Sequence, residues 1–149
     1  MATSREVVRD AVALLLASAL EDTGTGVGKP VKTVSSSKVE SLEGITPLVV
    51  VLSSGSGRER LTFQGDRASF RLLVQTWVRQ SATGWTQAQA EDALDKIEAG
   101  IAAVVEANQG TANWETLEYD GDSSIFEAVV AGVPYYVESI PLRVRLAHN

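Results

Sequence analysis

Residues 132–145 have the sequence GVPYYVESIPLRVR, and residues 114–122 have the sequence WETLEYDGD. Both stretches are rich in β-branched and aromatic residues, which predicts strands. Asp120-Gly121 can adopt the positive backbone torsions of a tight hairpin, so we predict a strand, a turn and a second strand there. A bend at residues 132–134 then leads into a long closing strand. Nothing in either stretch is typical of covalent catalysis, which favours a role in assembly.

The composition is that of one soluble domain. A chain of 149 residues, 44% hydrophobic and 21% charged, predicts a single domain over residues 1–149 that buries roughly 70% of its unfolded surface. No apolar run approaches the ~20 residues that a membrane span needs, so we expect no membrane partner. Acidic residues on both sides of the 11–20 apolar run favour a helix over a signal peptide. With no cysteine, disulfides and thiolate chemistry are excluded.

The net charge of −6 is unevenly distributed. Residues 1–75 contain nine Lys/Arg and eight Asp/Glu, a net of +1, whereas residues 76–149 contain four and eleven, a net of −7. A protein that grips nucleic acid concentrates cations against the phosphates. The acidic second half therefore indicates that DNA would pass this protein rather than be held by it.

Two helices are predicted. Thr3 and Glu6 fit a capping box, and the helix should end near Glu21. Its apolar face is expected to comprise Val8, Val12, Leu15 and Ala19, broadened by Leu14 and Leu16. Thr86 and Gln89 form a second capping box, before a helix that runs to about Asn108. Its apolar stripe is Ala90, Leu94, Ile97, Ile101 and Val104, with Glu91, Asp95 and Glu98 on the opposite, acidic face.

The strands before residue 80 differ in pattern. Pro47–Leu52 is a continuous apolar run, typical of a strand buried on both faces. We predict that Ser53–Gly57 is a connection and that Arg58–Phe63 returns as the hairpin partner. Residues 70–79 alternate as a half-buried strand, while the Ser-rich segment from Val31 to Ser41 is either an edge strand or a mobile arm.

The closing strand should place Ile140, Leu142, Val144 and Leu146 on one face. Ser139, Arg143 and Arg145 should then lie on the other. Because Pro141 cannot donate a ladder hydrogen bond, this strand is expected at an edge or bulged there. The element order predicts an α+β domain: a mixed, mostly antiparallel sheet with two main helices packed on it.

Three possible chemical sites are rejected. The Gly24–Lys29 segment departs from the phosphate-loop pattern, because Thr23 and Pro30 stand where Gly and Ser or Thr are needed. Turn chemistry and a solvated face explain Glu115, Glu118, Asp120 and Asp122 better than a metal site or an acid–base pair. His148 has no partner for zinc or for a triad. We expect no catalytic residue, no metal and no cofactor.

Two segments are candidate contact surfaces. The first is the Gly/Ser loop of residues 54–57 together with its charged stem, residues 58–60. Arg in that stem presents donors suited to carboxylates across an interface. The solvated turn is the competing interpretation. Trp77 is out of phase with the Phe70/Leu72/Val74 face, so it should emerge on the other side of the sheet, under a helix or in a contact. The candidate residues are Gly55, Gly57, Arg58, Glu59, Arg60, Trp77, Glu91, Asp95 and Glu98.

Over nearly its whole length the chain resembles the tail terminator proteins of long-tailed bacteriophages, also called minor tail or tail-completion proteins. The resemblance rests on the leading VVRDAV helix, the Ile45–Leu52 to Leu61–Phe63 hairpin, the Trp85–Asn108 helix and the Trp114–Arg145 ending. The YDGDS turn and YYVESIPLRV are its most family-like parts. The Ser35–Ser41 segment has no place in this pattern.

The resemblance implies a structural virion protein with no catalytic residues. Such proteins form hexameric rings at the head-proximal end of the tail tube, where they stop polymerisation and face the head's connector or stopper protein. DNA would pass through the ring, and an acidic lumen would repel phosphate. The protein would be made in the host bacterial cytoplasm and end in the virion. A head-completion or stopper protein is the nearest alternative; a small ligand-binding module is an alternative of another class.

A six-fold ring needs two different patches that meet on neighbouring subunits. We predict that the Gly55–Arg60 segment is one patch and the acidic face of Glu91, Asp95 and Glu98 the other. The double variant R58E/R60E should then fail to form rings while its monomer stays folded. Sedimentation measures the first property and circular dichroism the second; rings that persist would show that the pairing is wrong.

Overall fold

The computed structural model describes residues 4–21, 30–37, 42, 46–62, 65–81 and 86–146. Of residues 58–62 and 65–67 only the backbone is described. None of the helices described is long and apolar enough to cross a membrane. The elements are α1 (Arg5–Leu20), β1 (Thr33–Ser35), β2 (Leu48–Thr62), β3 (Gly65–Arg79), α2 (Gln87–Ala107), β4 (Thr116–Tyr119), β5 (Ser124–Val130) and β6 (Val133–Arg145).

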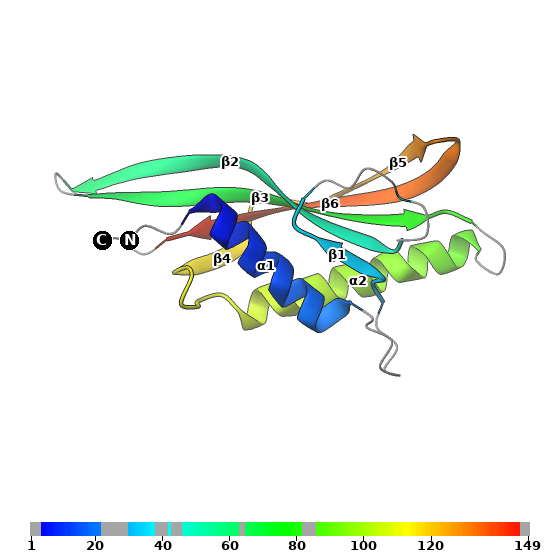
Figure 1. Ribbon diagram of the computed structural model, residues 1–149, viewed down its shortest axis with the longest axis horizontal. Coiled ribbons are helices and arrows are strands. Elements are labelled where there is room, and N and C mark those ends of the chain that lie inside the picture. Colours follow the sequence, from blue (N-terminus) through cyan, green and yellow to red (C-terminus); the bar gives the residue numbers. More distant parts are fainter. Residues whose placement is uncertain are drawn as a thin grey trace.

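The strands form one sheet in the order β1-β2-β3-β6-β4, with β5 also paired to β6. Only β1 and β2 run parallel; the other pairs are antiparallel. Both helices cover one face of this long sheet (Figure 1). The predicted α+β domain with a mostly antiparallel sheet is confirmed. The Ser-rich segment contributes a short edge strand, Thr33–Ser35, and its residues 38–41 lie outside the described part.

Helix α1 packs on a slightly different side from the one predicted. Ser4, not Thr3, caps it: the Ser4 hydroxyl accepts a hydrogen bond from the Val7 amide at 3.2 Å. Thr3 itself lies outside the described residues. The buried residues are Val8, Val12, Ala13, Leu16 and Leu20, whereas Ala19 and Leu14 are exposed, the latter by 68%. Both the predicted and the observed sets satisfy the helical period, so only packing against the sheet chooses between them.

Helix α2 follows its prediction. The Thr86 hydroxyl accepts from the Gln89 amide at 3.3 Å, and the Gln89 side chain accepts from the Thr86 amide at 2.8 Å. This reciprocal pair satisfies two amides that the first turn leaves without partners. The predicted stripe is buried, joined by Val105, and the helix ends at Asn108.

The prediction for Ser53–Gly57 is wrong. These residues are the middle of the 15-residue strand β2, which pairs with β3 from Leu48↔Trp77 to Thr62↔Gly65. The segment predicted to return, Arg58–Phe63, continues the same strand as far as Thr62. A bulge between Ser53 and Gly55 absorbs the irregular stretch.

The hairpin predicted at Asp120-Gly121 is also wrong. Strands β4 and β5 are both antiparallel to β6, so the chain keeps its direction between them and passes along one edge of β6. The tight turn lies instead between Val130 and Val133. Its central residues Ala131 and Gly132 have φ of 51° and 77°, and tight hairpins require such positive torsions because they match the strand twist.

Strand β6 is central, which contradicts the edge position expected from Pro141. It pairs with β3 along one side and with β4 and then β5 along the other. The Pro141 carbonyl accepts from the Asp120 amide at 2.9 Å, so its ring nitrogen points to the same side, where β4 has ended and β5 has not begun. The missing donor therefore falls at an interruption in the partner strands.

Two apolar clusters hold the sheet in place. The larger lies between the helices and the sheet and contains the buried alternation Phe70, Leu72, Val74 and Val78, as predicted. Ile140, Leu142 and Val144 of β6 join it, with Leu146 half-buried against it. The smaller lies on the opposite face and includes Leu48, Val50, Tyr135, Val137 and Leu42. Residues 48–51 are thus buried on both faces, as their continuous apolar run predicts.

The β5–β6 turn allows an opposed pair of substitutions. Ala131→Asn should raise the free energy of unfolding by about 1 kcal/mol, because Asn tolerates a left-handed backbone better than Ala. Gly132→Ala should lower it by about as much, and for a torsional reason alone, since no atom lies within 4 Å of the added Cβ position. Urea unfolding measures both; changes of the same sign would show that the turn has another conformation.

Candidate subunit-contact surfaces

The β2–β3 ribbon projects beyond the helices at one end of the molecule (Figure 1). Strand β1 pairs with β2 only at Leu48, Val49 and Val50. Among the described strands, none pairs with that edge of β2 from Val51 to Thr62. The candidate residues Gly55, Gly57 and 58–60 all lie on this ribbon, in an extended conformation that differs from the predicted connection. Their role in a subunit contact stays a prediction.

The base of the ribbon is held by polar contacts. Gly55 has φ of 150°, and a Cβ there would lie 3.3 Å from the Arg71 guanidinium. Gly57 faces the Ser69 hydroxyl in the same way, at 3.1 Å. Arg5 of α1 donates to the Ser56 hydroxyl at 3.1 Å, which ties the first helix to the ribbon. Glycine leaves room where these cross-strand side chains approach the backbone, and the positive φ at Gly55 favours it further.

The acidic side of α2 lies near the opposite end of the molecule, beside the sheet around β6. Glu91 and Asp95 are exposed and Glu98 is half-buried. Partial burial, and then the carboxylates of Glu91 and Glu127, raise the pKa of Tyr136. Burial, and then Glu98 and Glu138, raise the pKa of Tyr119. The predicted acidic face is therefore part of a wider negative surface to which β5 and β6 also contribute.

Glu138 is the buried member of this surface, with only 5% of its area exposed. It lies opposite Thr76 in the ladder, on the helix side of the sheet, and accepts from the Ser123 hydroxyl at 2.9 Å. Burial raises the pKa of Glu138, as do Glu98 and Asp95, while the Ser123 hydrogen bond lowers it. The Thr76 hydroxyl has no hydrogen-bond partner among the described residues. The periodicity of β6 places residue 138 inward, but no sequence signal marks it as a buried acid.

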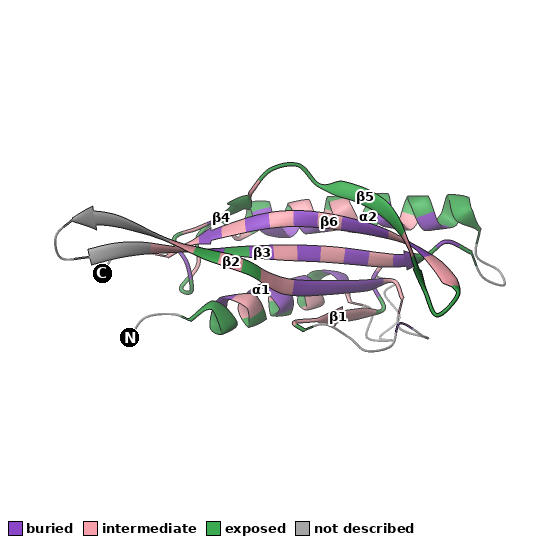
Figure 2. Ribbon diagram, turned by 90° about the horizontal axis from the view of Figure 1, so that it is seen from above, coloured by how far each residue is buried: buried purple, intermediate pink, exposed green. Residues whose placement is uncertain are grey.

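Strand β5 is exposed except at Ala128, which is half-buried, and Figure 2 draws most of it in green. No described strand pairs with its outer edge. Four apolar side chains are open to water, Ile125 by 59%, Phe126 by 44%, Val129 by 71% and Val130 by 36%. Sequence reasoning missed this surface, because a run of apolar residues in a strand is the usual signal of burial.

Two of the four clustered carboxylates pair with arginines of β6. Asp120 lies 2.9 Å from Arg143, and Glu118 lies 3.6 Å from Arg145. The Asp120–Arg143 pair is half-buried and the Glu118–Arg145 pair is more exposed. Both help to fix the register of β4 on β6, although a pair open to solvent contributes at most about 1 kcal/mol. Among the residues that the structure describes, no three His, Cys, Asp or Glu side chains come together as a metal site would require. His148 and the Gly24–Lys29 segment lie outside those residues.

Trp77 emerges on the face of the sheet away from the helices, as its phase predicts. It packs edge-on against Tyr135, with ring centres 6.0 Å apart and planes at 70°. It is half-buried against the smaller apolar cluster rather than under a helix. Its packing within the chain explains its position without a partner.

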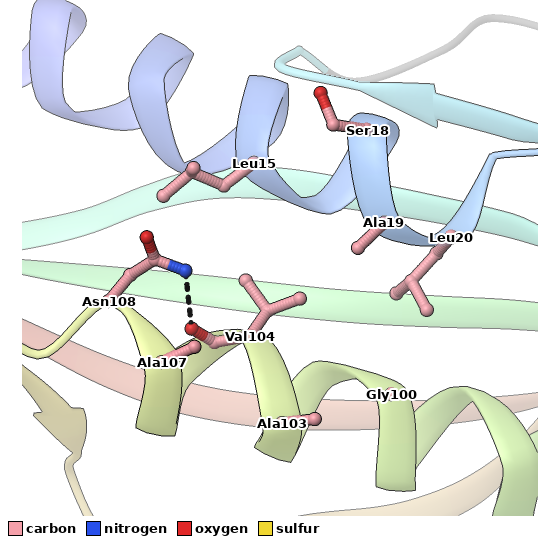
Figure 3. A pocket seen from close by; sticks show the side chains of 9 residues that line it. All are labelled: Leu15, Ser18, Ala19, Leu20, Gly100, Ala103, Val104, Ala107 and Asn108. Carbon is pink, nitrogen blue, oxygen red and sulfur yellow. Dashed lines mark hydrogen bonds between the residues drawn. The ribbon is translucent and has the colours of Figure 1, made fainter.

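A groove of about 450 Å³ lies between the two helices. Figure 3 shows its apolar walls and the Asn108 amide, which donates to the Val104 carbonyl at 2.8 Å. Because that amide is already engaged, the groove presents few polar groups to a ligand. Its lining residues are Leu15, Ser18, Ala19, Leu20, Gly100, Ala103, Val104, Ala107 and Asn108.

The candidate residues therefore lie in three separate regions rather than in one site. These are the β2–β3 ribbon, the acidic end of the molecule with Glu91, Asp95 and Glu98 of α2, and the cluster around Trp77 and Tyr135. The ribbon and the acidic end lie toward opposite ends of the long axis (Figure 1). No protein-family model matches the chain, and no curated protein matches its sequence.

The buried carboxylate gives a pH prediction. Because the folded-state pKa of Glu138 is raised, the folded chain binds a proton more readily than the unfolded chain above the ordinary pKa of 4.5. Stability should therefore fall as pH rises from about there through the raised pKa. Glu138→Gln should remove this slope and unfold at higher urea concentration at neutral pH. Glu127→Gln on exposed β5 is the matched control; equal effects would contradict the assignment.

Proposed function

We propose that this chain is a structural protein of a bacteriophage tail, a terminator that forms a hexameric ring on the head-proximal end of the tail tube. The ring would end tube polymerisation and provide the surface to which the head joins. The observation that carries the proposal is the presence of two unlike surfaces toward opposite ends of one sheet, the ribbon and the acidic end. They fit the architecture that the resemblance to tail terminators implies.

Unlike surfaces favour a closed ring over a two-fold dimer. A two-fold interface uses the same patch on both copies, whereas a ring uses two different patches that meet head to tail. The acidic face of Glu91, Asp95 and Glu98 and the ribbon that carries Arg58 and Arg60 are such a pair. Their separation along the molecule leaves both available at once, which a ring requires of every subunit.

The charge distribution suits a protein through which DNA passes. No Lys or Arg occurs between Lys96 and Arg143, a stretch that contains eight Asp and Glu. A lumen lined from this part of the chain would repel phosphates and allow the genome to move without being held. The other partners in this proposal are the tail tube protein and the head-tail connector or stopper. The protein would act in the virion after synthesis in the host cytoplasm.

A structural role also accounts for the charged residues that were candidates for a chemical site. Asp120 and Glu118 are paired with arginines of β6, and Glu138 is buried against the sheet. The two arginine pairs help to hold β4 on β6, and Glu138 accepts a hydrogen bond from Ser123. We therefore propose no catalytic residue and no cofactor for this protein.

A ligand-binding module is the second candidate, and the groove between α1 and α2 is the observation in its favour. Its size falls within the usual range for small-molecule sites, but such sites normally add several convergent polar groups. A head-completion or stopper protein, the nearest alternative, would share the ring architecture. It would differ only in lying on the head side of the head–tail junction (the neck) rather than on the tail tube.

Deletion of the gene from the phage that encodes it tests the proposal directly. Electron microscopy of the lysate should show tails of uncontrolled length and filled heads left unjoined. Tails of normal length beside heads that leak or fail to join would move the protein to the head side of the neck. Normal infectious particles would overturn the assembly proposal.

A further inference from the structure

Strand β5 offers an unpaired backbone edge flanked by exposed apolar side chains. No described strand pairs with its outer edge, and Ile125 and Val129 on one face and Phe126 and Val130 on the other are open to water. Such an edge is a ready template for another strand, and folded proteins normally protect it with charges, proline or a covering element. Here Glu127 is the one charged residue in the strand.

The register shows which backbone groups of β5 are available. Val130 and Val133 flank a two-residue turn, so they form a hydrogen-bonded pair. Farther along the two strands, non-hydrogen-bonded and hydrogen-bonded pairs alternate. The Gln80 amide on the β3 side donates to the Pro134 carbonyl at 3.1 Å, which agrees with this phase. The N–H and C=O groups of Ile125, Glu127 and Val129 therefore point outward.

The opposite edge of the sheet is also open. Beyond Val50, the outer edge of β2 has no partner among the described strands. From Ser53 to Gly57 it contains only Ser and Gly, and the side chain that contacts it from α1 is Arg5, at Ser56. One chain thus presents two unlike sheet edges that can meet only between copies.

The charges near the two edges are complementary. The ribbon segment 53–71 contains four Arg and two acidic residues, and Arg5 is bonded to it at Ser56. The surroundings of β5 are acidic, with Glu127 on the strand and Glu91 close enough to affect the same tyrosine, Tyr136. Opposite potentials of this kind favour the head-to-tail orientation and disfavour pairing of two identical acidic edges.

We propose that the outer edge of β5 in one copy pairs with the outer edge of β2, residues 51–57, in a second copy, so that the sheet continues from subunit to subunit. The contact is heterologous and can repeat around a ring. This inference deepens the proposed function, on which it rests for the closure of the ring. Main-chain hydrogen bonds would supply the binding, and Ile125 and Val129 would be covered on one face of the joint.

A charge substitution tests the contact. Val129→Lys should abolish the association of the purified chain in sedimentation velocity, because a lysine at an edge opposes strand addition. Leu14→Lys is the matched control: Leu14 is 68% exposed, against 71% for Val129, but lies on α1. Circular dichroism checks that both variants are folded. Association that survives Val129→Lys would overturn the proposal, as would equal loss in both variants.

Cysteine cross-linking identifies the partner edge, since the chain has no cysteine of its own. Single variants S54C and S56C on β2 are mixed in turn with I125C and V129C on β5 and oxidised. Disulfide-linked dimers should form in the mixtures and not in any single variant alone. Linkage of V129C to itself would indicate a two-fold β5 contact and overturn the proposal, as would the absence of cross-links in every mixture.

The contact and the proposed function can fail separately. Cross-linking between β2 and β5 in a protein whose gene deletion leaves tails normal would preserve the contact and overturn the terminator role. Uncontrolled tails in the deletion, together with normal tails in phage carrying Val129→Lys, would preserve the role and overturn the contact.

Discussion

The pairing of β6 on both of its edges is the constraint on which the rest of the structure depends. One edge of β6 pairs with β3, whose alternating buried residues pack against both helices. The other edge pairs first with β4 and then with β5. The strand carries Ile140, Leu142 and Val144 into the larger core and Tyr135 and Val137 into the smaller one. Displacing it by one residue would exchange these two sets between the faces.

This arrangement explains why the last part of the chain is interrupted where it is. Pro141 has no amide hydrogen to donate. It lies opposite the gap between the end of β4 and the start of β5. The residues between them, 120–123, are used for other contacts: Asp120 reaches Arg143, and Ser123 reaches Glu138. A bend that resembles a hairpin in sequence is therefore a step along one edge of a central strand.

A sheet with a shared central strand still has two outer edges, and in this chain they differ. The β2 edge is small, polar and continued into an arginine-bearing ribbon, whereas the β5 edge is apolar and surrounded by carboxylates. Helices cover only one face, and α1 lies alongside β2, to which Arg5 is bonded at Ser56 (Figure 2). No described strand pairs with either outer edge, from Val51 along β2 or along β5. Exposure of this kind is costly for a monomer that must stay soluble. It is understandable if the chain works as one of several copies, as we propose.

The sequence by itself determined the elements whose signals are local. The Thr86–Gln89 capping box specifies a helix start. The alternation from Phe70 to Val78 specifies a half-buried strand, and the apolar run before Leu52 specifies a strand buried on both faces. Each of these signals comes from nearby residues alone. It also placed the ribbon and the acidic helix face among the candidate surfaces. Tertiary structure decided the rest, because Ser53–Gly57 and Asp120-Gly121 have turn-like composition whatever their neighbours. Only pairing with β3 makes the first extended, and only the pairing of both β4 and β5 with β6 makes the second a bend rather than a hairpin. The same holds for β5: its apolar residues suggest burial, and only the order of the sheet shows that nothing described covers them.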